Sequence, residues 1–502
     1  MNLKERVDLA RLAEHDGQSI SVAGWVAQSR SSKGLHFIVL RDGTARCQCV
    51  VAEASVSEAS WAVATALTQE ASVWIKGTVH RDDRQEGGYE VQVESISLIG
   101  ASVDYPITPK DHGIDFLMNH RHVWLRSRRP WAMMKIRNQI ISSIHAFFQE
   151  EGFVQMDAPI LTGSSVEGTS TLFELDYFGS SAYLTQSGQL YGEAMALALG
   201  KIYTFGPTFR AEKSKTRRHL TEFWMIEPEM AFYDLDMNMD LAEAFLIRIV
   251  GDVLATCEEE LQVLGRDLAP LQQVKGPFPR LTYTEAVELL RSDKTQEMFE
   301  AREASLLQEQ AAIEAERSEN QKRYGQAKKH EKRRIDAREI EINRRQEEIE
   351  EALRNLPAWK ASAKSFTWGN DFGGSDETIL TWHFDRPIIV HRYPAAIKAF
   401  YMKRDPEDDR VALGMDVLAP EGYGEIVGGG QRADDLGFLI DQINAHDLPQ
   451  DAYEWYLDLR RYGSVPHAGF GLGLERTITW ICGLHHLRET IPFPRMMGKI
   501  HP

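Results

Sequence analysis

The chain has 502 residues, of which 43% are hydrophobic and 26% are charged, and its formal net charge is −17. This length exceeds what one hydrophobic core usually supports, so we expect two or three domains. No run of about 18 apolar residues occurs, and the N-terminal residues are charged throughout, so no membrane helix or signal peptide is expected. Four cysteines without metal-site spacing fit a reducing, cytoplasmic environment. The negative charge argues only weakly against a nucleic-acid partner, because local basic surfaces decide such binding.

The N-terminal part reads as short strands separated by turns. Five such strands follow one another within residues 17–100, interrupted by a helix at roughly 55–68. Five strands at this spacing predict a small closed barrel, for which the OB-fold is the common five-stranded case. We therefore assign residues 1–102 to an OB-fold domain. A His-, Arg- and Pro-rich segment without periodicity, 103–128, is expected to be a linker.

The next element is an amphipathic helix at 131–151, with Ile136, Ile140, Ile144 and Phe148 four residues apart. Strands and helices then alternate to the C-terminus, and strands predominate in two stretches. This pattern predicts an α+β domain with a largely antiparallel sheet. We place it in two sequence segments, 129–293 and 359–502, on either side of a stretch of different composition.

That stretch, residues 294–358, is dominated by Glu, Arg, Lys, Gln and Ala. Its apolar residues recur every seven positions in each half: Phe299, Leu306 and Ile313, then Ile335, Ile342, Ile349 and Leu356. A Tyr-Gly pair lies between the halves, so we predict an antiparallel helical coiled-coil hairpin. The alternative is one long helix whose apolar stripe would need a partner chain. The basic cluster 328–334 is a candidate RNA contact or a solvated surface.

The most informative stretch is 203–229. We expect two strands, one running through 209–212 and one through 219–224, joined by a loop that carries Lys213, Lys215, Arg217 and Arg218. A planar guanidinium such as that of Arg210 suits a phosphate, the loop cations suit further phosphates, and Phe223 offers an aromatic face to a base. A solvated surface hairpin would not explain charged residues inside apolar strands.

This stretch resembles motif 2 of the class II aminoacyl-tRNA synthetases, and within them the aspartyl/asparaginyl/lysyl subgroup. Two further segments support the resemblance. The helix 131–151 and the strand ending at Pro159 look like motif 1, which implies a homodimer. The glycine-rich stretch 469–476 is similar to motif 3. The resemblance covers nearly the whole chain except 294–358.

The resemblance implies adenylate formation from ATP, with Arg210 and Arg476 as the catalytic residues. It assigns nucleotide binding to Arg210, Glu212, Arg218, His219, Phe223, Glu425 and Arg476. Asp416 and Glu425 are expected to hold Mg²⁺, for which carboxylate oxygens are suitable ligands. Gly428 stands where relatives often carry a serine, which leaves the details of the metal site open.

For the amino acid, the resemblance points to L-asparagine. Gln189 is expected at the α-amino end, and Glu167 in a mobile loop near it. Where aspartyl enzymes have a lysine, this chain has Gly192. Glu227 is expected to accept from a carboxamide NH₂ and Arg432 to donate to its oxygen, whereas a carboxylate would meet a like charge. The other reading of these two residues is an internal salt bridge.

In the barrel, Phe37, Gln48 and Arg30 are expected to hold anticodon bases, with tRNA(Asn) as the partner. The sequence does not say which face of the barrel Phe37 occupies. The predicted activity joins asparagine, activated with ATP, to tRNA(Asn). Three alternatives remain: an aspartyl-tRNA synthetase with relaxed tRNA choice, a non-catalytic RNA-binding paralogue, and an amide-forming synthetase that acts on free aspartate.

Overall fold

The computed structural model describes all residues except 1, 109, 111, 164–170 and 215. The chain divides into two compact units, Met1–His120 and Arg121–Pro502. The segment 103–128, for which the sequence shows no periodicity, contains two short helices, α2 (Ile114–Asn119) and α3 (Arg121–Trp124). Within the described residues, no helix is long and apolar enough to cross a membrane.

The first unit is a closed five-stranded barrel with strand order β1-β2-β3-β5-β4, as predicted for an OB-fold. The strands are β1 (Ser19–Ser32), β2 (Leu35–Arg41), β3 (Arg46–Ala52), β4 (Ser72–Arg81) and β5 (Tyr89–Gly100), and α1 (Glu58–Ala66) lies between β3 and β4. Side chains of β2 alternate between the barrel core and its surface. Ile38 and Leu40 are buried, so Phe37 lies on the outer face, which answers the question left open by the sequence.

The second unit is built on an eight-stranded sheet with the order β12-β13-β14-β15-β16-β11-β10-β6. Its pairs are antiparallel except at the two edges, where β6 pairs with β10 and β12 with β13 in parallel. The strands are β6 (Val154–Met156), β10 (Lys201–Phe209), β11 (Glu222–Ala231), β12 (Arg280–Thr282), β13 (Ile388–His391), β14 (Gly414–Ala419), β15 (Gly424–Gln431) and β16 (His467–Gly473). The predicted, largely antiparallel sheet is confirmed.

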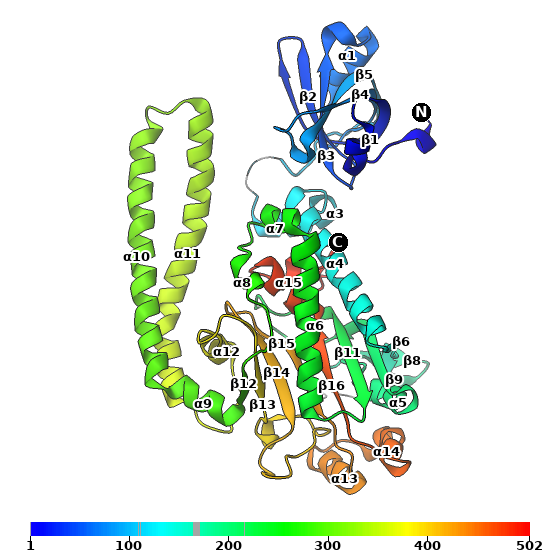
Figure 1. Cartoon of the computed structure of the whole chain (residues 1–502), viewed down its shortest axis with the longest axis vertical. Coiled ribbons are helices and arrows are strands. Elements are labelled where there is room, and N and C mark those ends of the chain that lie inside the picture. Colours follow the sequence, from blue (N-terminus) through cyan, green and yellow to red (C-terminus); the bar gives the residue numbers. More distant parts are fainter. Residues whose placement is uncertain (1, 109, 111, 164–170, 215) are drawn as a thin grey trace. The chain divides into compact units, whose positions relative to one another are not determined.

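Long helices cover one face of this sheet (Figure 1). The main ones are α4 (Arg128–Glu150) and α6 (Leu235–Thr256), and the predicted stripe from Ile136 to Phe148 is fully buried in α4. Ile226 and Met230 of β11 join that core. Because strand side chains alternate, Met225, Glu227 and Glu229 point to the opposite face, which is free to hold a site.

The remaining helices of this unit lie around the sheet: α5 (Gln189–Leu199), α7 (Glu258–Leu264), α8 (Ala269–Gln272), α9 (Tyr283–Arg291), α12 (Gly374–Thr381), α13 (Leu436–Ala445), α14 (Glu454–Arg461) and α15 (Leu474–Cys482). A separate three-stranded sheet contains β7 (Leu161–Thr162), β9 (Ser180–Leu184) and β8 (Glu174–Tyr177). Helix α15 begins directly after β16, so the glycine-rich strand runs straight into a helix.

The segment of different composition forms two long helices, α10 (Asp293–Tyr324) and α11 (Lys329–Ser365), which lie side by side in Figure 1. Buried apolar residues seven positions apart face each other: Phe299, Leu306 and Ile313 on α10, and Ile342, Ile349 and Leu356 on α11. Ile335, near the end of the hairpin, is only partly buried. At the base, the Phe299 ring packs edge-on against Trp382, with centroids 5.1 Å apart, so this end belongs to the core of the second unit.

Candidate active site

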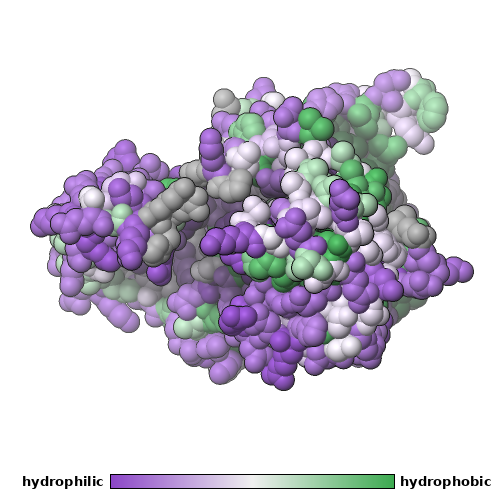
Figure 2. Space-filling view, turned by 90° about the horizontal axis from the view of Figure 1, so that it is seen from above, coloured by the Kyte–Doolittle hydropathy of each residue, from purple (hydrophilic) through white to green (hydrophobic). Residues whose placement is uncertain are grey.

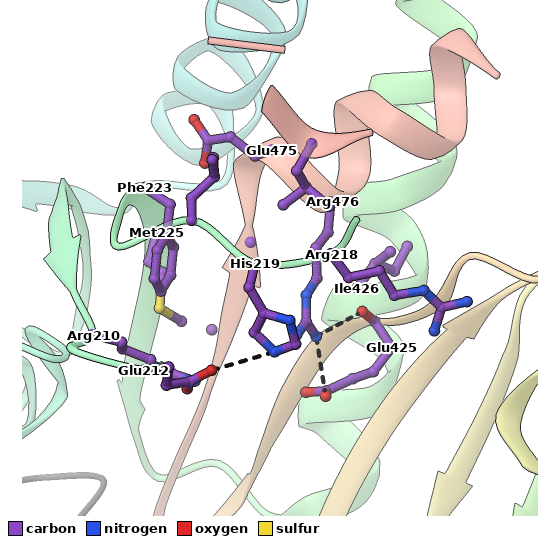
Figure 3. Close-up of a pocket in the computed structure, with 14 residues that line it drawn as sticks. Arg210, Glu212, Arg218, His219, Phe223, Met225, Glu425, Ile426, Glu475 and Arg476 are labelled. Atoms are coloured by element: carbon purple, nitrogen blue, oxygen red, sulfur yellow. Dashed lines mark hydrogen bonds and ion pairs between the residues drawn. The ribbon is translucent and has the colours of Figure 1, made fainter. Parts of the chain in front are cut away.

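A cleft opens on the face of the sheet opposite the long helices, over β11, β15 and β16 (Figure 3). The space within the cleft, part of it open to solvent, is about 690 Å³. Its lining includes all seven residues that the sequence assigned to the nucleotide: Arg210, Glu212, Arg218, His219, Phe223, Glu425 and Arg476. Segments more than 250 residues apart in the chain therefore meet in one place.

The expected strand boundaries at the cleft are wrong. Strand β10 ends at Phe209 and β11 begins at Glu222, so Arg210, Glu212 and His219 all lie in the connecting loop. The Arg210 amide still donates across the hairpin to the Thr221 carbonyl (3.1 Å), but the Ala211 amide donates to the Thr171 carbonyl (2.8 Å) and the Thr221 amide to the Arg495 carbonyl (2.9 Å), so regular pairing stops there. Arg210 is consequently half-buried rather than fully buried.

Within this loop, several charged side chains already have partners. The Arg210 guanidinium lies 5.5 Å from the centre of the Phe223 ring, within cation–π range. His219 Nε2 lies 3.3 Å from Glu212 Oε2. Burial lowers the pKa of His219, although Glu212 opposes this effect, so the imidazole is neutral near pH 7. Arg218 donates to the carbonyl of Gly422, and Lys215 lies outside the described residues.

On the other side of the cleft, Arg476 Nη1 lies 3.3 Å from Glu425 Oε2 and donates to the Glu425 carbonyl at 3.1 Å. The preceding residue, Glu475, was missed by the sequence analysis. Its buried carboxylate accepts from Arg137 of α4 (2.8 Å) and from the Trp224 amide of β11 (2.9 Å). Glu475 therefore fixes the start of α15, and with it Arg476, to the sheet.

Asp416 and Glu425 converge as expected for a pair of metal ligands. A Cβ placed on Gly428 would lie 2.6 Å from Glu425 Oε1 and 3.4 Å from Asp416 Oδ1, so both carboxylates reach the same spot. A serine at position 428 would therefore displace the end of the Glu425 side chain. Burial raises the pKa of Asp416 to about 6, against the opposing effect of Lys398, whose Nζ lies 2.8 Å from Oδ2.

Glu377 of α12 is a third carboxylate beside this pair, and no sequence pattern pointed to it. Its Oε2 accepts from the Glu425 amide at 3.2 Å. Burial, and then the charge of Glu425, raise its pKa to about 7. The described residues contain no group of three or more His, Cys, Asp or Glu side chains with full metal-site geometry. The convergent oxygens nevertheless suit Mg²⁺, which keeps several waters and needs few protein ligands.

The residues expected to bind the amino-acid substrate include Glu227 on β11 and Arg432 just after β15. The expected arrangement, in which these two side chains face each other, is wrong. The Glu227 carboxylate does not face Arg432. It accepts from the Ser187 hydroxyl, from the Gly188 amide (2.8 Å) and from the Thr204 hydroxyl (3.2 Å). The internal Glu227–Arg432 salt bridge, the other reading of these residues, is also absent from the ion pairs of the described chain.

Arg432 instead pairs with Glu229, two residues further along β11. Nη2 lies 2.5 Å from Glu229 Oε1 and Nε lies 3.3 Å from Oε2, and both side chains are almost fully buried. Two contacts to one carboxylate give a planar, bidentate arrangement. Glu229 was missed because the sequence shows two glutamates on the same face of a strand and does not say which one lies opposite the arginine.

A second buried carboxylate, Glu193 of α5, supports this arrangement. It accepts from Arg460 (2.7 Å) and Tyr456 (2.7 Å), and His467 Nε2 lies 3.1 Å away. Burial has the largest single effect and acts to raise the pKa of Glu193, but Arg460, His467 and Arg432 together outweigh it, so the pKa is lowered. The Gln189 amide donates to Glu193 at 3.0 Å, so its side chain points into this network. Glu167, the last expected substrate residue, lies outside the described residues.

The three expected anticodon residues come together on the barrel surface. Arg30 of β1 stands opposite Phe37 of β2, and its guanidinium lies 4.7 Å from the centre of the ring. The same guanidinium donates to the Gln48 side chain of β3 at 3.3 Å. An aromatic face, a cation and an amide thus share one exposed strip, a combination that suits unpaired bases.

Comparison with known families decides the class of protein. The family described as tRNA synthetases class II (D, K and N) matches residues 113–497, and the OB-fold nucleic acid binding domain matches residues 20–99. The chain belongs to the class II tRNA synthetases. The predicted resemblance, the OB-fold barrel and the class II catalytic domain are thereby confirmed.

Among individual class II synthetases, the chain is 50% identical to an asparagine–tRNA ligase of Sorangium cellulosum over 98% of both chains. It is 47% identical to one of Chloroflexus aurantiacus over 100% of both. The structure of Pyrococcus horikoshii asparaginyl-tRNA synthetase complexed with asparaginyl-adenylate superposes with a TM-score of 0.83 at 36% identity, covering 99% of this chain and 100% of that one.

Proposed function

We infer that this synthetase activates L-asparagine with ATP and transfers it to tRNA(Asn). The substrate carboxylate attacks the α-phosphorus, asparaginyl-adenylate forms and pyrophosphate leaves. A terminal ribose hydroxyl of the tRNA then attacks the activated carbonyl, and AMP leaves. One observation carries this inference: a chain similar along its whole length to asparagine–tRNA ligases brings the seven residues expected to bind ATP into one cleft.

The side chains at the cleft suggest how the first step is accelerated. Arg210 is within reach of the α-phosphate and Arg476 of the outer phosphates, so positive charge is in place where negative charge develops. Phe223 offers a stacking face to adenine, opposite Arg476. No side-chain nucleophile is needed, because catalysis rests on positioning and charge stabilisation.

Asp416 and Glu425, with Glu377 beside them, would hold Mg²⁺ at the phosphate end of the cleft. When bound, the ion would neutralise charge on the phosphate oxygens. Lys398 keeps Asp416 in place through its 2.8 Å ion pair.

Selection of asparagine rests on Arg432, which is held by Glu229 so that its remaining donor can meet the carboxamide oxygen. The nucleotide cleft adjoins this pocket through Gly471, at which an added Cβ would lie 3.8 Å from Glu227 Cγ. An aspartyl-tRNA synthetase is the second candidate, but Gly192 supplies no cation for a second carboxylate.

A homodimer is part of the proposal. Val154 on the edge strand β6, Leu161 on β7 and Phe178 beside β8 leave large apolar side chains exposed, with Phe178 93% exposed. An exposed apolar patch next to an open sheet edge is typical of a protein interface. A cytoplasmic location follows from the same function and stays a prediction.

Exchange of ATP with labelled pyrophosphate, without tRNA, tests the proposal. Asparagine and aspartate are compared side by side with Mg²⁺ present. Exchange with asparagine alone supports the function, whereas exchange with aspartate alone contradicts the substrate assignment. No exchange with either amino acid would favour an RNA-binding protein without catalysis.

A further inference from the structure

The free end of the α10–α11 hairpin carries a charge opposite to that of the rest of the chain. Residues 320–338, here called the hairpin tip, contain eight Lys or Arg residues and two Asp or Glu residues, whereas the whole chain has a net charge of −17. In Figure 2 the hairpin is the left-hand lobe and its surface is predominantly hydrophilic. The tip is therefore a local basic surface on an acidic protein.

The cations along the shaft of the hairpin are paired across the two helices. Arg317 Nε lies 2.7 Å from Glu339, Arg345 Nε lies 2.6 Å from Glu309, and Lys360 Nζ lies 3.1 Å from Glu300. These pairs fix the register of the helices, as charged residues beside a hydrophobic seam commonly do. These cations of the shaft are thus neutralised by carboxylates of the hairpin itself.

Several cations of the tip, unlike those of the shaft, lack such partners. Lys322, Lys328 and Arg334 are exposed and form no ion pair with any described residue. Arg323 has only a 4.0 Å contact with Glu319, and Lys332 lies 5.0 Å above the Tyr324 ring. Lys322, Lys328 and Arg334 are consequently available to a ligand, whereas Arg338, at the shaft end of the tip, is paired with Glu316 at 2.7 Å.

This arrangement does not stabilise the hairpin. Lys328, the N-cap residue of α11, and Lys332 are like charges four residues apart, a spacing that disfavours a helix. Cations in the first turn of α11 also oppose the helix dipole. Apolar contact does not account for the tip either, because Tyr324, at 38% exposure, is the one large hydrophobic side chain exposed among its described residues.

We propose that the hairpin tip binds the phosphate backbone of the tRNA substrate. Lysine and arginine side chains without internal partners match a polyanion and carry no base specificity, so the contact adds affinity rather than sequence recognition. Helix α10 has 32 residues, about 48 Å at 1.5 Å per residue, so the tip lies far from the base of the hairpin. The proposal rests on the proposed function, because it takes tRNA as the ligand.

The test is the salt dependence of tRNA binding by the full-length protein. In one variant Lys322, Lys328 and Arg334 are all replaced by Gln. The probe is a tRNA(Asn) transcript, titrated at several salt concentrations. Each lost phosphate contact lowers the slope of log affinity against log salt by about 1, so the slope should fall by about 2 to 3.

The matched control replaces three exposed cations at the base of the same helices, Lys294, Arg354 and Lys364, by Gln. Both variants should keep the wild-type melting temperature and the wild-type exchange rate with asparagine, since exchange needs no tRNA. A wild-type slope and affinity in the tip variant would refute the proposal, as would an equal loss in the control. Failure of exchange in the unaltered protein would instead refute the proposed function.

Discussion

Gly469→Ala tests whether the Glu229–Arg432 pair sets the amino-acid pocket. Gly469 stands opposite Glu229 in the β11–β16 ladder. A Cβ on Gly469 would lie 2.3 Å from both Cδ and Oε1 of Glu229, and 2.4 Å from Oε2. The backbone of Gly469 is not left-handed, so alanine meets no conformational strain there and the substitution tests space alone.

The magnitude follows from these distances. Non-bonded heavy atoms ordinarily lie about 3.5 Å apart or more, so the Glu229 carboxylate must move roughly 1 Å away from the added Cβ. It is fully buried and bound to Arg432, so it has little room to move. Overpacking of this kind costs about 1–3 kcal/mol, and breaking a buried ion pair costs about 3–5 kcal/mol. A partial shift worth about 2 kcal/mol would raise the KM for asparagine about 30-fold.

The assay is pyrophosphate exchange with asparagine and ATP varied separately, together with thermal unfolding. The KM for asparagine should rise much more than that for ATP, because the nucleotide cleft is lined by other residues. Gly206→Ala on β10 is the matched control, because an added Cβ there meets nothing within 4 Å. If Gly469→Ala behaves like this control, Glu229 does not hold Arg432 in the way described.

Three further changes probe other parts of the site and the fold. Arg210→Ala should reduce exchange by at least about 100-fold with an unchanged melting temperature, since charge stabilisation of this kind contributes about 3–4 kcal/mol; normal exchange would remove Arg210 from the mechanism. Asp416→Asn should raise the Mg²⁺ concentration needed for half-maximal exchange, because it removes a hard ligand and leaves Lys398 without its partner; an unchanged Mg²⁺ titration would argue against the metal site. Burial, and then Arg392, lower the pKa of His391 from 6.5 to about 4. Below pH 6.5 the unfolded chain therefore binds a proton at this histidine more readily than the folded chain, and the free energy of unfolding decreases as the pH is lowered. At pH 5 this loss is about 2 kcal/mol, and His391→Gln should lose less stability than the wild type between pH 7.5 and 5 in parallel thermal melts; equal losses would show that His391 does not titrate as described.

Sequence periodicity predicted the elements of this fold well because burial repeats at the spacing of the element. The i+4 stripe of α4 and the alternation in the barrel strands are local patterns, which can be recognised in the sequence without knowing which elements pack against them. The strand ends beside Arg210 were predicted wrongly because they depend on distant partners. Their hydrogen-bond partners are the backbones of Thr171 and Arg495, which no local pattern reveals.

Six of the seven residues expected to bind the nucleotide could be picked out from sequence because they stand in two recognisable local motifs, 203–229 and 469–476. Glu377 and Glu475 could not, because their roles come from contacts with residues far away in the chain. Glu475 reaches Arg137, 338 positions earlier, and Glu377 reaches the amide of Glu425. A lone glutamate on a helix is usually solvated, so neither stands out before the fold is known.

Discrimination against aspartate follows from the sum of charges rather than from one pair. Three buried carboxylates, Glu193, Glu227 and Glu229, surround the pocket, and two buried guanidinium groups, Arg432 and Arg460, oppose them. Both arginines are already paired with these carboxylates, so an aspartate side chain would bring a further negative charge to described cations that are already neutralised. A carboxamide brings none and still offers an oxygen to Arg432. We therefore predict that the preference for asparagine depends on Glu229 staying paired with Arg432, which is why the absence of a side chain at Gly469 matters for substrate choice.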